Sequence, residues 1–130
     1  MNSITLERSA LKPGETLFGN VSWSIAHPPR DLEVRLFWYN GEPGQGEART
    51  VERHKLGEAQ EGRANFEFDL PQLPWSVKGH VIQVGWAVEL VEKKAGGLAV
   101  ADFTMSPDGK VVTLGRVENA ITEKKSLSRP

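Results

Sequence analysis

Apolar and polar residues alternate along most of this chain, and this alternation constrains the fold more than any other feature of the sequence. It is clearest in four segments, residues 17–25, 32–39, 66–70 and 81–91. In the first of these, Leu17, Val21 and Trp23 share one face, while serine and asparagine residues occupy much of the other. Because successive side chains of a strand point to opposite sides, a period of two predicts half-buried β-strands.

Shorter segments have the same character, and turn-forming residues separate the candidates from one another. The shorter strand candidates are residues 4–6, 50–56, 98–103 and 111–114. Proline and glycine gather between candidates, as at residues 13–14, 28–29, 41–44, 96–97 and 107–109. About eight short strands without a long helical period predict an all-β fold, an antiparallel β-sandwich of the immunoglobulin-like type.

The pattern is weakest at residues 48–60 and at the C-terminal end. Helix propensity alone would allow a helix over residues 48–60, but the β-branched pair Thr50-Val51 favours a polar edge strand. We expect residues 1–115 to form the sandwich. The polar tail, residues 116–130, is expected to stay disordered or to form one helical turn.

The apolar faces of the strands predict the composition of the core. We expect the core to contain Leu17, Val21, Trp23, Leu36, Trp38, Phe66, Phe68, Val84, Trp86 and Val88. Three of the four tryptophans of the chain are in this set. Their large aromatic side chains remove much apolar surface from water when they are buried, which makes core packing the simple account of them.

The composition excludes several classes of function. Lys and Arg total 16 against 17 Asp and Glu, so the net charge is −1 and the chain lacks the positive excess of a nucleic-acid-binding protein. It has no cysteine, which excludes disulfides, cysteine-ligated zinc and thiol catalysis. No apolar run is long enough to cross a bilayer, and residues 1–8 lack the pattern of a secretory signal. We therefore expect a cytoplasmic protein without membrane insertion.

Two stretches of the sequence resemble the arrestin-like domains. Residues 12–21 contain a Pro-Gly-Glu turn that leads into a strand with the pattern Leu17-x-Gly19-x-Val21. Residues 66–76 contain Phe-x-Phe-x-Leu-Pro and then Leu-Pro-x-Ser, ahead of the longest strand candidate. The order and spacing of these two motifs match the family pattern over about residues 3–105.

The arrestin-like family includes arrestins, the related retromer cargo-binding subunit and bacterial sporulation-control proteins. Most members carry two such sandwiches in tandem, and 130 residues have room for one. The resemblance therefore implies a single arrestin-like lobe. It also implies a non-catalytic adaptor or scaffold that binds a protein partner.

Residues that could support catalysis are present, but they do not form recognised patterns. None of His27, His54 and His80 pairs with another ligand at a metal-binding spacing. Glu67 and Asp69 lie two residues apart on the outward face of one strand, where a solvated surface explains them better than a pair of catalytic carboxylates. We expect no enzyme activity, no metal site and no cofactor.

Phe37 and Tyr39 are the candidate residues for binding a partner. They alternate with Leu36 and Trp38, so strict alternation places two aromatic side chains on the outer surface, where Phe18 would join them from its own strand. A contiguous exposed aromatic patch is typical of a contact surface. Alternatively, a bulge or residues 48–60 cover these side chains. The expected function is binding of a protein partner, or self-association through a sheet face or an edge strand.

Trp75 supports a second hypothesis of a different class. It lies in the loop formed by residues 73–76 and not on an apolar strand face. An exposed tryptophan in a loop can stack on a sugar or another small ligand, and it can equally cap the end of a sandwich. The alternative function is therefore a small-ligand or carbohydrate-binding sandwich that uses Trp75 and the neighbouring loops.

Overall fold

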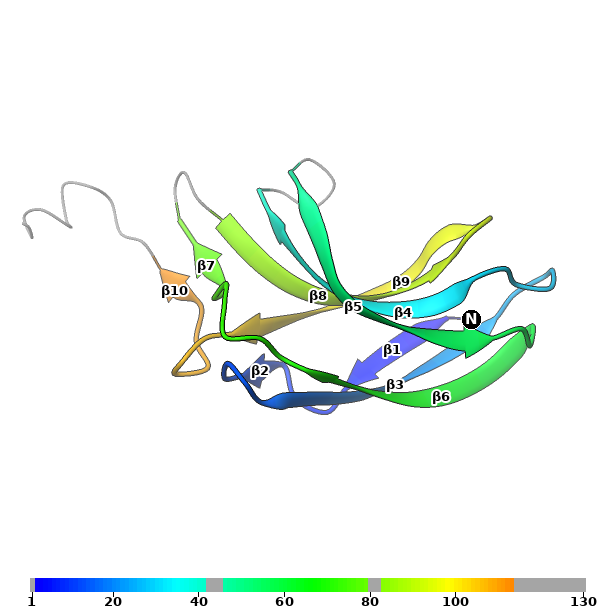
Figure 1. Ribbon diagram of the computed structural model, residues 1–130, viewed down its shortest axis with the longest axis horizontal. Helices are drawn as coiled ribbons and strands as arrows, with labels where there is room; N and C mark the ends of the chain where they lie inside the picture. Colours follow the sequence, from blue (N-terminus) through cyan, green and yellow to red (C-terminus); the bar gives the residue numbers. More distant parts are fainter. Residues whose placement is uncertain (1, 42–45, 80–82, 114–130) are drawn as a thin grey trace, which may run out of the picture.

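A computed structural model of the chain describes residues 2–41, 46–79 and 83–113. Over this range there is no helix, and ten strands form two sheets. Figure 1 shows the two sheets as layers that lie one above the other. The expected all-β sandwich is confirmed. The tail predicted at residues 116–130 lies outside the described residues, and so does His80, which was expected to open the longest strand.

The smaller sheet has three strands, in the order β1 (Ser3–Leu6), β3 (Thr16–Ser24) and β6 (Glu61–Asp69). The larger sheet follows the order β10 (Val112–Thr113), β7 (Val77–Lys78), β8 (Gln83–Glu92), β4 (Leu32–Asn40) and β5 (Ala48–Gly57). It is completed by β9 (Gly96–Met105), which pairs with β8, and by β2 (Ala10–Leu11), which pairs with β9.

The strand pairs are antiparallel except at two short contacts, β2 with β9 and β7 with β10, which are parallel. The sequence pattern did not indicate β2 and β7, because a strand of two residues is too short to show a period of two. The long strands lie where the alternation predicts them. Residues 48–57 form a strand at the edge of the larger sheet, as the β-branched pair in this segment indicated.

The inner faces of the two sheets meet in one core. Eight of the ten expected core residues are buried, and the structure adds others, among them Leu11, Val34, Leu90, Phe103 and Met105. Trp38 and Val84 are only half-buried, so the prediction that these two residues belong to the buried core is wrong. Trp38 is near the end of β4 and Val84 near the start of β8, and Figure 1 shows these parts of the two strands turning away from the smaller sheet.

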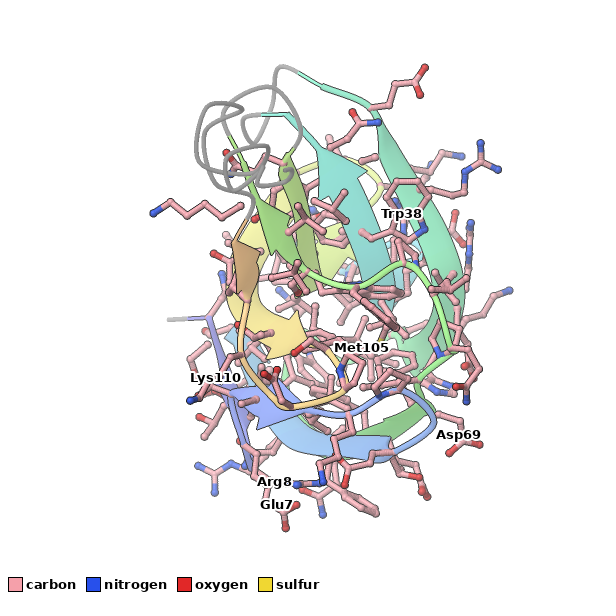
Figure 2. The ribbon with its side chains drawn as sticks, turned by 90° about the vertical axis from the view of Figure 1, so that its left-hand side faces the viewer. Glu7, Arg8, Trp38, Asp69, Met105 and Lys110 are labelled. Atoms are coloured by element: carbon pink, nitrogen blue, oxygen red, sulfur yellow. The ribbon has the colours of Figure 1, made fainter. Side chains whose placement is uncertain are left out.

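An end-on view shows how this opening affects the core. Figure 2 shows Met105 between the two layers and Trp38 beside the outermost strand of the larger sheet. Trp38 borders a groove whose other walls are Glu47 and residues of β5, including Arg49 and Arg53. The rest of its indole packs against the core. Strand alternation therefore predicts the direction of this side chain but not the point where the covering layer ends.

Large and small residues face each other on the inner side of the smaller sheet. The register of β3 and β6 places Gly19 opposite Phe66 and Trp23 opposite Gly62. A Cβ atom built on Gly19 would lie 2.6 Å from Cζ of Phe66, and one on Gly62 would lie 2.6 Å from Cζ2 of Trp23. The aromatic rings therefore lie directly on the backbone of the neighbouring strand, which packs the core densely without a third layer of side chains.

The Pro-Gly-Glu turn of the first arrestin-like motif has a clear physical basis. Gly14 adopts a φ of +84°, a conformation that side chains other than hydrogen disfavour. The amide of Glu15 donates to the carbonyl of Lys12, and the amide of Lys12 donates in return to Oε1 of Glu15 at 2.7 Å. A backbone and a side-chain hydrogen bond thus close the turn, and β3 begins directly after it.

The second motif carries the chain from the smaller sheet to the larger one. Ser76 is buried, its hydroxyl accepts a hydrogen bond from the Met105 amide at 2.9 Å, and its own amide donates to the Met105 carbonyl at 2.7 Å. Its carbonyl accepts a bond from the Val112 amide. Pro74, two residues earlier, accepts a 2.7 Å hydrogen bond from the indole N–H of Trp86. The motif therefore ties the crossing loop to the core.

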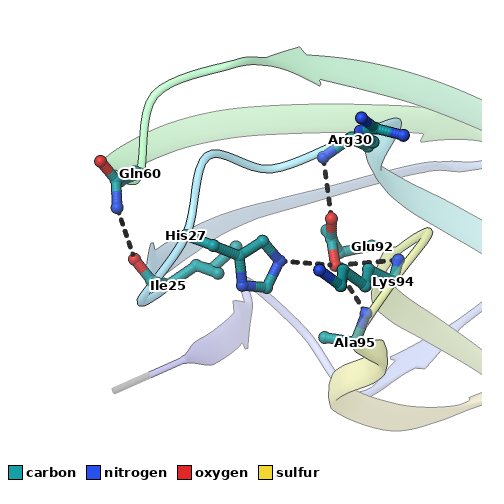
Figure 3. A network of polar contacts seen from close by, with 7 residues as sticks. All are labelled: Ile25, His27, Arg30, Gln60, Glu92, Lys94 and Ala95. Carbon is teal, nitrogen blue, oxygen red and sulfur yellow. Dashed lines mark hydrogen bonds and ion pairs between the residues drawn. The ribbon is translucent and has the colours of Figure 1, made fainter.

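A buried carboxylate organises the opposite end of the sandwich. The side chain of Glu92, at the end of β8, is fully buried. It accepts hydrogen bonds from the backbone amides of Arg30, Lys94 and Ala95, and His27 contacts it at 3.4 Å (Figure 3). Glu92 therefore holds the β3–β4 connection against the β8–β9 turn.

These hydrogen bonds favour the ionised form of Glu92. The amides of Arg30 and Ala95 lower the pKa of its carboxyl to about 2, from an ordinary value of 4.5, and this effect outweighs the burial that would raise it. Contact with His27 acts in the same direction. Between these two pH values the unfolded chain binds more protons at this position than the folded chain does. The contribution of Glu92 to stability is therefore complete above about pH 4.5 and is lost as the pH falls toward 2.

Replacing Trp86 by alanine tests the packing of the core. The side chain is fully buried and donates its N–H to Pro74, so the variant leaves a large cavity and an unpaired carbonyl. We expect the free energy of unfolding to fall by about 3 to 5 kcal/mol. Chemical denaturation followed by circular dichroism measures this change. Phe18→Ala, at an exposed position, is the control and should change stability little. An unchanged midpoint for Trp86→Ala would contradict the strand register.

Replacing Glu92 by glutamine tests the buried carboxylate. The amide group has one oxygen to accept hydrogen bonds and brings an N–H₂ toward backbone donors, so we expect a lower denaturation midpoint at pH 7. The difference from the wild-type chain should narrow as the pH falls from 4.5 toward 2, because the wild type loses its advantage there. Glu58→Gln, in the exposed β5–β6 turn, is the matched control. A constant difference at all pH values would show that ionisation of Glu92 does not stabilise the fold.

Candidate functional site

Phe37 and Tyr39 lie side by side on the outer face of the larger sheet. Val34 and Leu36 of the same strand are buried in the core, so the alternate residues point outward. The two ring centroids are 6.0 Å apart with an interplanar angle of 42°. Both side chains are half-buried. The structure thus brings this predicted pair together, on a strand that has neighbours on both sides.

Small residues of β8 lie beneath the two rings. The register places Ala87 opposite Phe37 and Gly85 opposite Tyr39. Ala87 is fully buried although it belongs to the outer face and not to the core cluster. A Cβ atom on Gly85 would lie 2.3 Å from Cζ of Tyr39, so the phenol ring lies directly on the strand backbone. The Tyr39 ring therefore rests on the sheet, and the Phe37 ring is tilted against the Tyr39 ring.

Charged residues continue this face toward the other end of β4. Glu33 is only 4% exposed, although it lies on an outer face. Its carboxylate contacts Nε of Arg35 and lies 3.6 Å from a guanidinium nitrogen of Arg53 on β5. Burial raises the pKa of the nearby Glu89 carboxyl, and the positive charge of Arg35 partly opposes that effect. Charged side chains therefore border the aromatic pair on this side, and Glu33 forms ion pairs with Arg35 and Arg53 there.

Valine and aspartate of β9 form the next border. Val100, which faces Glu89 across the sheet, is 59% exposed. Asp102 faces Ala87 and helps to line a shallow depression where β8 changes partner from β9 to β7. Tyr39 forms one wall of this depression. We call the surface formed by Phe37, Tyr39 and Val100 the aromatic face.

Phe18 does not join the aromatic face. It belongs to β3 of the smaller sheet, and it is 46% exposed on the outer side of that sheet. The expectation that Phe18 extends the patch of Phe37 and Tyr39 is therefore wrong, because β3 and β4 lie in different layers of the sandwich. Phe18 borders a separate shallow groove with Thr5, Asn20 and Asn65. Periodicity indicates the side of a strand but not the sheet to which the strand belongs.

Trp75 lies in the loop between β6 and β7, and its side chain is exposed. Its indole N–H donates to the carbonyl of Gln72 at 3.2 Å, so this donor is engaged within its own loop. Leu73, in the same loop, is also exposed, and the peptide bond between Leu73 and Pro74 is cis. The structure thus places Trp75 at the end of the sandwich, apart from the aromatic face.

The two described histidines make contacts that support the fold. His27 contacts the buried carboxylate of Glu92. His54 stacks on Phe68 with ring centroids 4.7 Å apart, and its Nε2 lies 3.0 Å from the Glu67 carbonyl oxygen. Among residues 2–41, 46–79 and 83–113, no group of three or more His, Asp or Glu side chains is placed to hold a metal ion. That same range contains no helix long and apolar enough to span a bilayer.

The sequence analysis missed two features of the aromatic face. One is the burial of Glu33, and the other is the contact of the Tyr39 ring with the Gly85 backbone. Both depend on the pairing of β4 with β5 and β8. Sequence periodicity shows which residues of one strand share a side, but it carries no information on which strands become neighbours. A glycine in the interior of a strand candidate is the one available signal, because it often marks a close approach.

No protein-family model matches the chain, and no curated protein matches it either. The solved structures that are similar to it in part include a sporulation control protein and a DNA glycosylase. The sporulation control protein Spo0M of Bacillus subtilis superposes with a TM-score of 0.49 and 18% sequence identity, over 97% of this chain and 54% of its own. The alkylpurine DNA glycosylase AlkC of Pseudomonas fluorescens gives a TM-score of 0.41 and 14% identity, over 81% of this chain and 30% of its own.

The chain spans about half the length of Spo0M and about a third of AlkC. The fold is established by the strands themselves: the described residues form a β-sandwich of two layers.

Proposed function

We propose that this chain is a non-catalytic protein-interaction domain whose partner contacts the aromatic face. The observation that carries the proposal is the pair of Phe37 and Tyr39 rings, which lie in contact on the outer surface of a central strand. Aromatic side chains are enriched in the core of protein interfaces, where they bury a large area at a small cost in conformational entropy. The resemblance to arrestin-like domains also implies an adaptor.

The support beneath the rings makes this surface suitable for recognition. Tyr39 lies against the Gly85 backbone, and β4 has a neighbouring strand on each side, so the rings keep their orientation before a partner arrives. A preorganised surface loses little freedom on binding. The Glu33 carboxylate is already paired with Arg35 and Arg53. A partner can therefore cover this border without desolvating an unpaired charge. The proposed partner presents apolar side chains to the rings.

A role in catalysis and a sugar site at Trp75 have less support. Both described histidines make contacts that hold loops or strands together, and the indole N–H of Trp75 is engaged with Gln72 in its own loop. We therefore propose that the chain acts without a cofactor. We also propose that it acts in the cytoplasm.

A double substitution, Phe37→Ser with Tyr39→Ser, tests the aromatic face. We expect proteins captured from a lysate of the source cell by the wild-type chain to be lost with the double variant, since both ring surfaces are removed. Quantitative mass spectrometry of the captured material measures this loss. Circular dichroism and a denaturation midpoint confirm that the variant is folded.

Phe18→Ser is the matched control, because Phe18 is an exposed aromatic residue on the outer face of the other sheet. It should retain the captured proteins. Gly85→Ala is a second variant that keeps both aromatic residues but displaces the Tyr39 ring, and it should weaken capture. If the folded double variant captures the same proteins as the wild type, the aromatic face is not the binding surface.

A further inference from the structure

The strand β6 forms an open edge of the smaller sheet. It pairs with β3 through nine residues without a register shift, and among the described strands no other pairs with it. The other long edges are interrupted: the pairing of β5 with β4 contains two register shifts, and that of β9 with β8 contains one. A bulge makes an edge a poor template for another strand, whereas a regular edge is a good one.

Alternate residues of β6 direct their backbone groups to this open edge. At the two ends of the strand, the Gln60 carbonyl accepts a bond from Ile25, and the Leu70 amide donates to Glu15, so even-numbered residues face β3. The Glu67 carbonyl instead accepts a hydrogen bond from the His54 ring of β5. The odd-numbered residues therefore present their N–H and C=O groups outward along the edge. They are Glu61, Arg63, Asn65, Glu67 and Asp69.

The side chains of the same odd-numbered residues lie on the outer face and are exposed. Within the described part of the chain, Arg63 has no ion-pair or hydrogen-bond partner. Asp69 accepts a hydrogen bond from the Thr16 hydroxyl at Oδ1, which holds its carboxylate on this face. The edge thus carries one unpaired cation and, toward its end, two carboxylates.

We propose that a second copy of this chain pairs with the β6 edge, antiparallel and about a two-fold axis at Phe66. In this register Arg63 of each copy faces Asp69 of the other, and Asn65 faces Glu67 of the other. These are residues whose backbone groups point to the edge, so each opposed pair also exchanges backbone hydrogen bonds. The two three-stranded sheets then form one continuous six-stranded sheet.

Charge selects this register over its neighbours. An axis at Asn65 would place Glu61 opposite Asp69, and an axis at Glu67 would place Glu67 opposite itself. An axis at Ala64 or at Phe68 likewise opposes two carboxylates. Like charges directly opposite each other destabilise a strand pair, while opposite charges stabilise it. The axis at Phe66 opposes no like charges.

The inner side of the edge also accommodates a second copy. Ala64 would lie opposite Phe68 of the other copy, which repeats the pairing of small and large residues between β3 and β6. A groove beside the edge is lined by His54, Lys55 and Leu56 of β5 and by residues 64–67 of β6. Pro71 has no N–H to offer and ends the pairing. The Glu67 carbonyl has two lone pairs, so the bond to His54 and the bond across the axis can coexist.

Sedimentation of the whole chain over a range of concentrations tests this proposal. The wild type should reach twice the 14.4 kDa of one chain. Arg63→Asp should sediment as a single chain, because it places two carboxylates opposite each other. Adding Asp69→Arg to that variant should restore the dimer, because the exchanged charges again oppose one another. Asn65→Pro should also lose the dimer while it stays folded, since its amide faces the edge and not β3.

Two controls separate this surface from the others. Glu52→Lys, on the edge of the larger sheet, should keep the dimer, and so should Phe37→Ser with Tyr39→Ser on the aromatic face. Circular dichroism and denaturation midpoints verify the folding of every variant. A wild type that stays at 14.4 kDa at all concentrations would overturn the proposal. A dimer that survives both Arg63→Asp and Asn65→Pro would overturn it as well, and would place self-association elsewhere.

Discussion

The burial of Trp86 between the two sheets is the constraint on which the rest of the structure depends. Its side chain is fully buried, it faces Trp38 on one side and Phe103 on the other, and its N–H is satisfied by Pro74. A tryptophan is stable in a core only when its polar N–H finds an acceptor. The crossing loop must therefore pass close to β8, and this loop also carries Ser76, which ties β9 and β10 to the same place.

The surfaces of the sandwich follow from how its edges and faces are completed. Small residues lie opposite Phe37 and Tyr39, the Tyr39 ring rests on the Gly85 backbone, and paired charges form the border of that surface. On the other sheet, the regular register of β3 with β6 leaves one straight edge open, while bulges interrupt the long edges of the larger sheet. A sheet face and a strand edge offer different chemistry, side-chain contact in one case and backbone hydrogen bonds in the other. One small sandwich can therefore present two separate binding surfaces.

Much of the fold could be predicted from the sequence. The alternation in residues 17–25, 32–39 and 81–91 correctly identified the long strands, as far as these residues are described, and most of the core, because burial on one face imposes a period of two. The strands β2 and β7 could not be predicted, since two residues show no period. The buried position of Glu92 could not be predicted either, because its partners come from the distant loop at Arg30 and from the turn that follows β8.

The candidate site divides in the same way. The sequence by itself determined that Phe37 and Tyr39 point away from the core, because their neighbours Leu36 and Val34 must be buried and the period of a strand is two. Only the tertiary structure decided that Phe18 lies on a different surface, that Glu33 is buried beside Arg35, and that β6 is left without a neighbour on one side. Strand alternation is a local property of the backbone, whereas the choice of neighbouring strands is made by contacts between residues far apart in the chain.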